Sequence, residues 1–213
     1  MHIPHQSSNQ TDYPAACYAA EILLVHNAVV QTVWPEVAKA LLAAGVKLRC
    51  DPSTLSAIQP LTSQHSSQIQ PATQEDFDTE FLSPTLAVCS TPSLSDAIKF
   101  INAHSSHHTD TIITESEENG STFCRAVDSA GTFINASTRF ADGFRYGFGT
   151  EVGISTGRTH ARGPVGLEGL MIYKYMLKSK SQKGHTAGEF GTGSDKKQFK
   201  HRDLDASSVP FLL

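Results

Sequence analysis

The sequence lacks the features of a membrane or secreted protein. Its 213 residues contain no apolar run near the roughly 20 residues that a membrane-spanning helix requires. The first ten residues, MHIPHQSSNQ, have no basic start followed by an apolar core, as a secretory signal would. The chain carries 17 basic and 21 acidic residues, a net charge of -4, which argues against binding to nucleic acids or anionic membranes. We therefore predict a cytoplasmic protein with neither kind of partner.

Cysteine is also scarce, and the four cysteines form no CxxC pair. Such scattered thiols are typical of a reduced intracellular protein rather than of a disulfide framework or a zinc site. Cys50, Cys89 and Cys124 lie in or beside apolar stretches, so we expect them in the core. Cys17 differs, because it stands among small residues in DYPAACYAAEILLVH (12–26). From the residues alone, Cys17 is either a packed side chain or an exposed nucleophile on a tight turn.

The hydrophobic residues, 39% of the chain, alternate between strand-like and helix-like patterns. This alternation predicts βαβ units in an α/β fold, a mostly parallel sheet with flanking helices. Gly45 is expected to end one helix, and Ser93 with Asp96 to cap another. The Ser/Gln/Pro-rich segment 59–73 is predicted to be a surface loop, and residues 1–11 to be disordered. Strands are expected at 21–26, 46–50, 85–91, 109–114, 131–137 and 170–177, and helices near 32–45, 53–58, 93–103 and 116–129.

Three segments together resemble one enzyme family. They are the cysteine segment above, DAIKFINAHSSHHTDTII (96–113), and the glycine-rich NASTRFADGFRYGFGTEVGIST (135–156) with HARGPVGLEGL (160–170). In this order and spacing they are similar to gamma-glutamyl phosphate reductase, also called glutamate-5-semialdehyde dehydrogenase, of the aldehyde dehydrogenase superfamily. The resemblance covers about residues 12–178. It implies NADPH-dependent reduction of gamma-glutamyl phosphate to glutamate-5-semialdehyde and phosphate, through a cysteine thioester, in proline biosynthesis.

The resemblance also implies a domain organisation. Residues 12–157 would form an aldehyde dehydrogenase-like catalytic domain, and 158–213 a C-terminal loop, an oligomerisation strand and a flexible tail. The strand would be the apolar LMIYKYML (170–177), which favours a homo-oligomer. Coupling to glutamate 5-kinase is a further partner that the family suggests.

Roles for individual residues follow from the same resemblance. Cys17 would be the nucleophile, with its own backbone N–H as an oxyanion donor. Glu80 would hold the nicotinamide ribose, and its alternative is a solvated loop carboxylate. Substrate anions would meet Arg139, flanked by the hydroxyls of Ser137 and Thr138, and also Arg162. The alternative for both arginines is that they anchor the glycine-rich loop.

The histidine-rich end of the second segment admits a metal site as an alternative. His104, His107 and His108 are close in sequence, but no cysteine or carboxylate stands at convincing ligand spacing. We therefore predict no metal, and expect His108 and Asp110 to fix the turn into the following strand. Phe100, where the family usually has histidine, is expected to pack rather than react.

Two departures from the family keep a second hypothesis open. Tyr18 follows the cysteine where the family usually has asparagine, so a ring is expected to crowd the pocket. The chain also looks like the C-terminal half of a family member, without the nucleotide-binding domain. The alternative to an active enzyme is therefore a truncated, catalytically silent fragment that at most binds a full-length partner. A generic aldehyde dehydrogenase is a third reading, which the segments HTDTII and ARGPVGLEGL disfavour.

Overall fold

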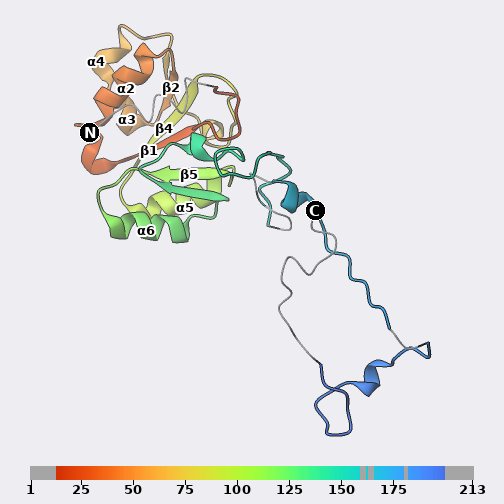
Figure 1. Cartoon of the computed structure of the whole chain (residues 1–213). Coiled ribbons are helices and arrows are strands. Elements are labelled where there is room, and N and C mark those ends of the chain that lie inside the picture. Colours follow the sequence, from red (N-terminus) through yellow and green to blue (C-terminus); the bar gives the residue numbers. More distant parts are fainter. Residues whose placement is uncertain (1–12, 159–161, 163–165, 180–181, 200–213) are drawn as a thin grey trace. The chain divides into compact units, whose positions relative to one another are not determined.

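The structure is a computed structural model that describes residues 13–158, 162, 166–179 and 182–199 (Figure 1). The chain divides into two compact units, Met1–Met171 and Ile172–Leu213. The predicted functional boundary after residue 157 stays a prediction. The disorder predicted for residues 1–11 lies outside the described residues.

The first unit contains two parallel sheets. The four-stranded sheet has the order β1-β4-β2-β3, and β5 pairs with β6 in the two-stranded sheet. Parallel neighbours need long crossovers, and helices supply most of them here. The strands are β1 (Ile22–His26), β2 (Lys47–Cys50), β3 (Ile69–Pro71), β4 (Thr85–Thr91), β5 (Thr109–Ile112) and β6 (Gly131–Ile134). The helices are α2 (Trp34–Ala43), α3 (Pro52–Ala57), α4 (Gln59–Thr62), α5 (Leu94–His104) and α6 (Glu117–Ala126).

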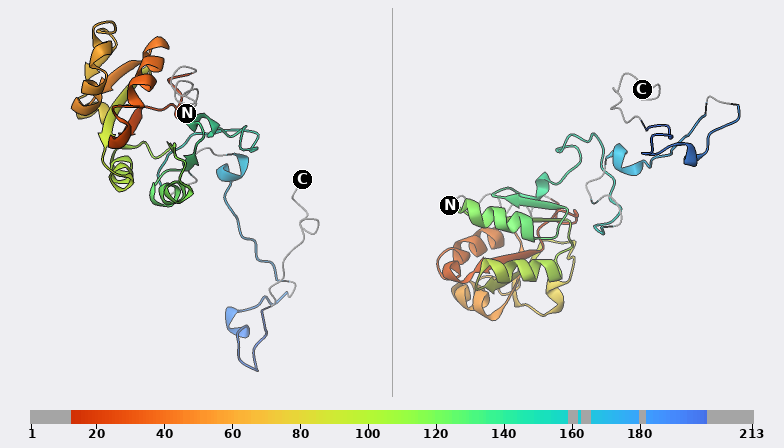
Figure 2. Two further views of the ribbon diagram at one scale, coloured as in Figure 1. Left: turned by 90° about the vertical axis from the view of Figure 1, so that its left-hand side faces the viewer. Right: turned by 90° about the horizontal axis from the view of Figure 1, so that it is seen from below.

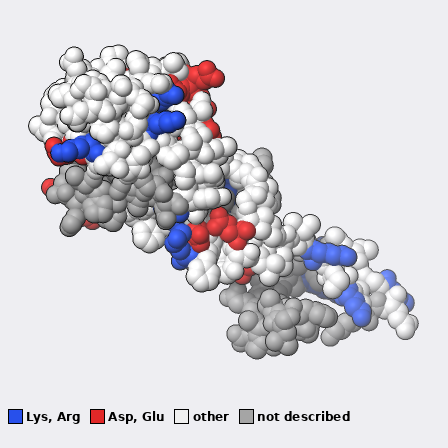
Figure 3. Space-filling view, turned by 90° about the horizontal axis from the view of Figure 1, so that it is seen from above, with Lys and Arg blue, Asp and Glu red and all other residues white. Residues whose placement is uncertain are grey.

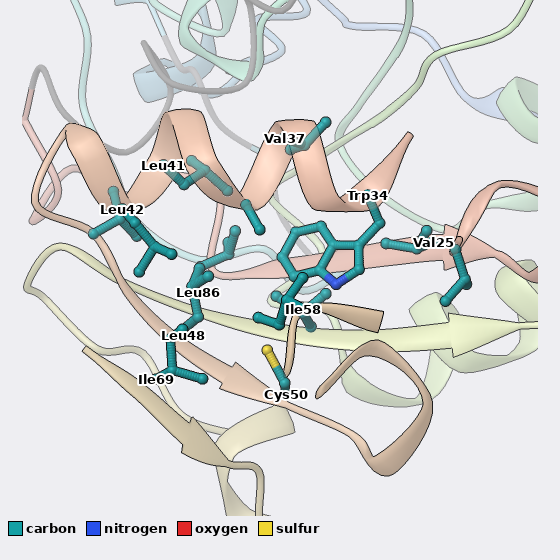
Figure 4. Packing of buried hydrophobic residues seen from close by; sticks show 14 residues of the cluster. Val25, Trp34, Val37, Leu41, Leu42, Leu48, Cys50, Ile58, Ile69 and Leu86 are labelled. Carbon is teal, nitrogen blue, oxygen red and sulfur yellow. The ribbon is translucent and has the colours of Figure 1, made fainter. Parts of the chain in front are cut away.

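Strand β4 contributes side chains to the cores on both faces of the four-stranded sheet, because successive side chains of a strand point to opposite faces. Leu86 and Val88 join the larger core with helix α2, whereas Ala87 and Cys89 join a smaller core with Phe100 of α5. Figure 4 shows the larger core around the indole of Trp34, whose N–H donates to the Thr54 carbonyl at 2.9 Å. Helices α5 and α6 pack side by side (Figure 2).

Local signals in the sequence explain where the helices begin and end. Gly45 follows α2 with a φ of +84°, a conformation that suits glycine. The Ser93 hydroxyl accepts from the Asp96 N–H at 3.1 Å and donates to the Asp96 carboxylate at 2.6 Å, which confirms the predicted cap of α5. Helix α3 is capped by Asp51, whose Oδ1 accepts from the Thr54 N–H at 2.7 Å.

Two sequence predictions were wrong, and a third is not tested within one chain. Segment 59–73 is not simply a loop, because it contains α4 and the edge strand β3, whose Ile69 is buried. Cys124 is only half-buried on α6 and lies outside both cores. The strand predicted at 170–177 has no partner strand within the described chain and stays a prediction, because its expected partner is another subunit. Leu170 ends the 3-10 helix η4 (Leu167–Leu170), and residues 171–179 are irregular and exposed.

The second unit is held by polar contacts around a short 3-10 helix, η5 (Ala187–Glu189). Glu189 accepts from the Thr186 N–H at 2.9 Å and from Lys197 Nζ at 2.7 Å. The Lys197 ammonium is the main cause that lowers the pKa of Glu189 to about 2. A bridge between Phe190 and Lys197 closes the segment.

Two properties bear on binding to membranes or nucleic acids: the distribution of basic side chains and the length of apolar helices. On the face drawn in Figure 3, lysine and arginine side chains are scattered between uncharged areas rather than gathered in one patch. Within the part of the chain that the structure describes, no helix has both the length and the apolar character to cross a membrane.

Candidate active site

Cys17 lies on a turn just before β1. The Ala16 N–H donates to the Tyr13 carbonyl at 3.1 Å, and the Ala19 N–H to the Ala16 carbonyl at 2.8 Å, which closes two successive turns around the cysteine. Ala15, Ala16 and Ala19 are the small residues of this path, and Tyr18 directly follows the cysteine. Cys17 is exposed, so the packing alternative does not apply to it.

A histidine faces the thiol. Cys17 Sγ lies 3.3 Å from His108 Nε2, a hydrogen-bonding distance for sulfur. The His108 side chain is buried, and its Nδ1 lies 2.9 Å from the Thr109 hydroxyl. The sequence prediction for His108 was limited to fixing a turn and missed this contact. No local signal pairs the two residues, because Cys17 lies before β1 of one sheet and His108 before β5 of the other.

The surroundings shift the two pKa values in opposite directions. Partial burial of the sulfur raises the pKa of Cys17; the Glu151 and Glu80 carboxylates add to this, while the backbone N–H of Cys17 opposes it. Burial lowers the pKa of His108, against the opposing effects of Glu151 and Asp110. Both shifts favour a neutral thiol beside a neutral imidazole at rest.

The glycine-rich segment forms a second wall of the site. Glu151 Oε2 accepts from the Gly143 N–H at 2.9 Å, which closes the loop between them. A side chain at Gly143 would collide with the Thr150 carbonyl, so this position requires glycine. A cavity of about 190 Å³ lies under this segment, lined by Cys17, His108, Glu151 and residues 153–156.

The predicted anchor residues at 137–139 hold the turn that carries Cys17. The buried Thr138 hydroxyl donates to the Tyr18 carbonyl at 2.6 Å, and the Arg139 guanidinium lies over the Tyr18 ring, 5.1 Å from its centroid. Ser137 caps the short helix η3 (Thr138–Phe140) by accepting from the Arg139 N–H. Tyr18 is not among the described residues lining the two cavities, so its ring does not crowd them.

Arg162 lies in a different set of contacts. Its guanidinium donates to the Asp128 carboxylate at 2.9 Å and to the Thr156 carbonyl at 2.9 Å. Arg158 pairs with the same carboxylate. This arrangement matches the alternative in which Arg162 anchors the loop, whereas its contact with substrate stays a prediction.

Glu80 lies at a larger cavity of about 870 Å³, which Cys17 and His108 also line. The side chain of Glu80 is exposed, and its charge acts on the neighbouring Glu21. Burial, with the Glu80 charge second, raises the pKa of Glu21 to about 7, while the Phe81 N–H opposes the shift. Lysine and arginine are absent from the described residues that line this cavity.

The other predicted polar residues have structural contacts. Asp110 Oδ2 accepts from the hydroxyls of Ser105 at 2.9 Å and Ser129 at 2.5 Å, which confirms that it fixes the turn before β5. His104 Nδ1 lies 2.7 Å from Asp78, and Phe100 packs edge-on against Phe77, as expected. Over the described ranges, no three His, Cys, Asp or Glu side chains are grouped to hold a metal ion.

Comparison with known proteins identifies the relatives of this chain. It is 48% identical over 202 residues to gamma-glutamyl phosphate reductase 1 of Synechocystis sp., an alignment that covers 95% of this chain and 44% of that protein. It is 45% identical over 196 residues to gamma-glutamyl phosphate reductase of Haloquadratum walsbyi, covering 92% and 42%. This chain is a homologue of the gamma-glutamyl phosphate reductases. It spans less than half the length of these curated relatives.

A solved structure supports the same relationship. The crystal structure of gamma-glutamyl phosphate reductase from Thermotoga maritima matches with a TM-score of 0.73 at 37% identity, over 84% of this chain and 42% of that one. The predicted resemblance to the reductase and the α/β fold class are thereby confirmed. No protein-family model matches the chain.

The reductase resemblance implies a nicotinamide cofactor, and the described residues fit one end of it. The exposed Glu80 carboxylate, at the same cavity as Cys17, offers acceptors for ribose hydroxyls. Phosphate groups need cationic or N–H donors, and the described lining of this cavity contributes no lysine or arginine. The described lining therefore offers a carboxylate for ribose hydroxyls and no cationic side chain for the phosphates of NADPH.

Proposed function

We propose that this chain carries the acyl-transfer site of a gamma-glutamyl phosphate reductase. The reaction would reduce gamma-glutamyl phosphate to glutamate-5-semialdehyde and phosphate, with NADPH, in proline biosynthesis. The observation that carries the proposal is the exposed thiol of Cys17, 3.3 Å from a buried imidazole and beside a cavity. That arrangement offers a nucleophile, a proton acceptor and room for an acyl group.

The covalent chemistry takes place at the sulfur of Cys17. The sulfur attacks the carbonyl carbon of the acyl phosphate, and the backbone N–H of Cys17 stabilises the oxyanion. The C–O bond to phosphate breaks with its electron pair, which leaves a thioester on Cys17. Glu80 would hold the nicotinamide ribose, and NADPH, when bound, would supply the hydride that converts this thioester to the aldehyde. The cysteine sulfur would then depart as the leaving group and be restored.

Substrate anions require cationic partners near the sulfur. We assign this role to Arg139, which lies over Tyr18, the residue that follows Cys17. Ser137 and Thr138 support it, the first through the Arg139 N–H and the second through the Tyr18 carbonyl. Arg162 would reach substrate only by exchanging its Asp128 partner.

A second candidate is the catalytically silent fragment. The absence of lysine and arginine from the described lining of the larger cavity favours it, because NADPH phosphates find no cationic partner there. Under this proposal the chain would keep its fold and its reactive thiol. It would bind the cofactor only if residues outside the described lining of the larger cavity supplied the phosphate contacts.

The experiment that separates these candidates is phosphate-dependent reduction of NADP by the purified chain with glutamate-5-semialdehyde. Turnover that is lost in Cys17→Ser and kept in Cys124→Ser would support the enzyme, since Cys124 is half-buried on α6 and lines neither cavity. A folded chain without turnover would support the silent fragment.

The proposed partners follow from the resemblance. We propose a cytoplasmic homo-oligomer whose contact includes the exposed segment 170–177, and coupling to glutamate 5-kinase, whose product the reductase would consume. Exposed apolar side chains such as Tyr173 and Leu177 suit a subunit contact. Analytical ultracentrifugation of wild type and Tyr173→Ser would test the oligomer: a monomeric wild type contradicts it.

A further inference from the structure

We propose that His108 is the catalytic base that removes the proton from Cys17 as the sulfur attacks the acyl phosphate, and that Thr109 holds its tautomer. The proposal rests on the proposed function for the identity of the electrophile. The structural basis of the proposal is the contact between Cys17 and His108, which does not involve the cofactor or the substrate anchors.

The geometry places one ring nitrogen at the sulfur and the other at a fixed partner. Nε2 is 3.3 Å from Cys17 Sγ, and Nδ1 is 2.9 Å from Thr109 Oγ1. When Nδ1–H donates to the Thr109 hydroxyl, Nε2 carries the free lone pair and can accept from the thiol. Thr109 begins β5, so a strand rather than a loop fixes this partner.

The ring cannot easily turn away from the sulfur. His108 is 8% exposed, and Asp110, two residues later, is held by the hydroxyls of Ser105 and Ser129. The Gly131 N–H also donates to the His108 carbonyl at 2.9 Å. The backbone on both sides of the imidazole is therefore tied to the β5–β6 sheet, which preorganises the base.

Carboxylates at the two cavities are the competing bases. Glu21, Asp78, Glu80 and Asp110 line the larger cavity, and Glu151 lines the smaller one. The hydrogen bond described for Cys17 Sγ goes to His108, and Glu151 Oε2 accepts from the Gly143 N–H instead. The hydrogen-bond geometry thus favours the His108 imidazole, rather than a carboxylate, as the base for the Cys17 proton.

The electrostatics agree with a base that acts during attack rather than with a preformed ion pair. The pKa of Cys17 is raised and that of His108 is lowered, so the resting proton stays on sulfur. During attack the S–C bond forms, the S–H bond breaks and Nε2 gains the proton. Glu151 and Asp110, the acidic groups that face the ring, stabilise the imidazolium. The imidazolium then returns its proton to the departing phosphate, which leaves as hydrogen phosphate and restores neutral His108.

The test is the pH dependence of Cys17 alkylation by iodoacetamide, followed on the Cys17 peptide by mass spectrometry. In the wild-type full chain we expect two rises in rate. The first comes as His108 loses its proton and becomes able to accept one, and the second as the thiol itself ionises. His108→Gln should keep only the second rise, with a loss of about 10-fold or more at neutral pH. Acylation by acetyl phosphate should fall about 100-fold or more, within the range of general base catalysis.

Matched variants separate this role from a structural one. His104→Gln, whose imidazole contacts Asp78 instead, should keep both rises. Thr109→Val should weaken the first rise and leave the second, because it removes only the partner of Nδ1. A single rise in the wild-type chain, or two rises in a folded His108→Gln, would overturn the proposal. Two rises without reductase turnover would support the proposal and contradict only the proposed function.

Discussion

The hydroxyl of Thr138 offers a sharp test of how the nucleophile is positioned. It donates to the Tyr18 carbonyl at 2.6 Å across 120 residues of sequence, and Thr138 is 3% exposed. Thr138→Val keeps the shape of the side chain and removes only this donor. A buried acceptor that loses its partner costs about 1–3 kcal/mol. We expect the free energy of unfolding in urea to fall by that amount.

The turn at Cys17 should loosen together with this loss of stability. Because the Tyr18 carbonyl follows the reactive sulfur directly, alkylation of Cys17 at neutral pH should also slow as the His108 contact is populated less. The matched control is Thr62→Val, whose hydroxyl donates to the Gln59 carbonyl at 2.7 Å on the exposed surface. That variant should change stability by less than about 0.5 kcal/mol. If both variants lost the same stability, or Thr138→Val left both measurements unchanged, the argument would fail.

Three further changes have expected outcomes. Glu151→Gln removes a carboxylate that raises the pKa of both Cys17 and His108, so both rises in the alkylation profile should move to lower pH; an unmoved profile would contradict the assigned electrostatics. Glu21 has a pKa of about 7 in the fold against an ordinary 4.5, so the folded state binds more protons between these values and stability should fall as pH rises through them. Glu21→Gln should remove that slope from urea unfolding curves, and a slope that persists would refute the assignment. Leu41→Ala, at 1% exposure in the larger core, should cost about 2–5 kcal/mol by thermal or urea unfolding, and a loss below about 1 kcal/mol would show that the site is not packed as described.

The elements that the sequence predicted well are those whose signals are local. Strand β4 reads TLAVCST, an apolar run that suits a strand covered on both faces, and the structure buries it on both. Helix α5 begins at Leu94, directly after its Ser93 cap. In each case a few neighbouring residues carry the signal, so no knowledge of distant contacts is needed.

The failures have a different physical origin. The segment 59–73 looks like a polar loop, yet Ile69–Pro71 becomes a strand because β2 offers it an open edge to pair with. The apolar segment 170–177, in turn, has no neighbouring strand in the described chain, and its predicted pairing with another subunit stays a prediction. A strand depends on its partner, and a partner distant in sequence leaves no mark in the segment itself.

The candidate site shows the same difference between local signals and contacts that are distant in sequence. Small residues around Cys17 and the segments shared with the reductases pointed to the nucleophile, but its partner His108 lies 91 residues away. The substrate role assigned to Thr138 stays a prediction, and nothing in the sequence indicated that its hydroxyl holds the backbone beside the nucleophile. Both contacts cross from one βα unit to another, and they exist only because the turn before β1 meets the start of β5 and the segment after β6. A residue's chemistry can therefore be predicted from its type and neighbours, while its role depends on which turn the fold places against it. For this chain the role of His108 decides whether the thiol reacts as a neutral group assisted by a base, and the two-rise alkylation profile reports on that directly.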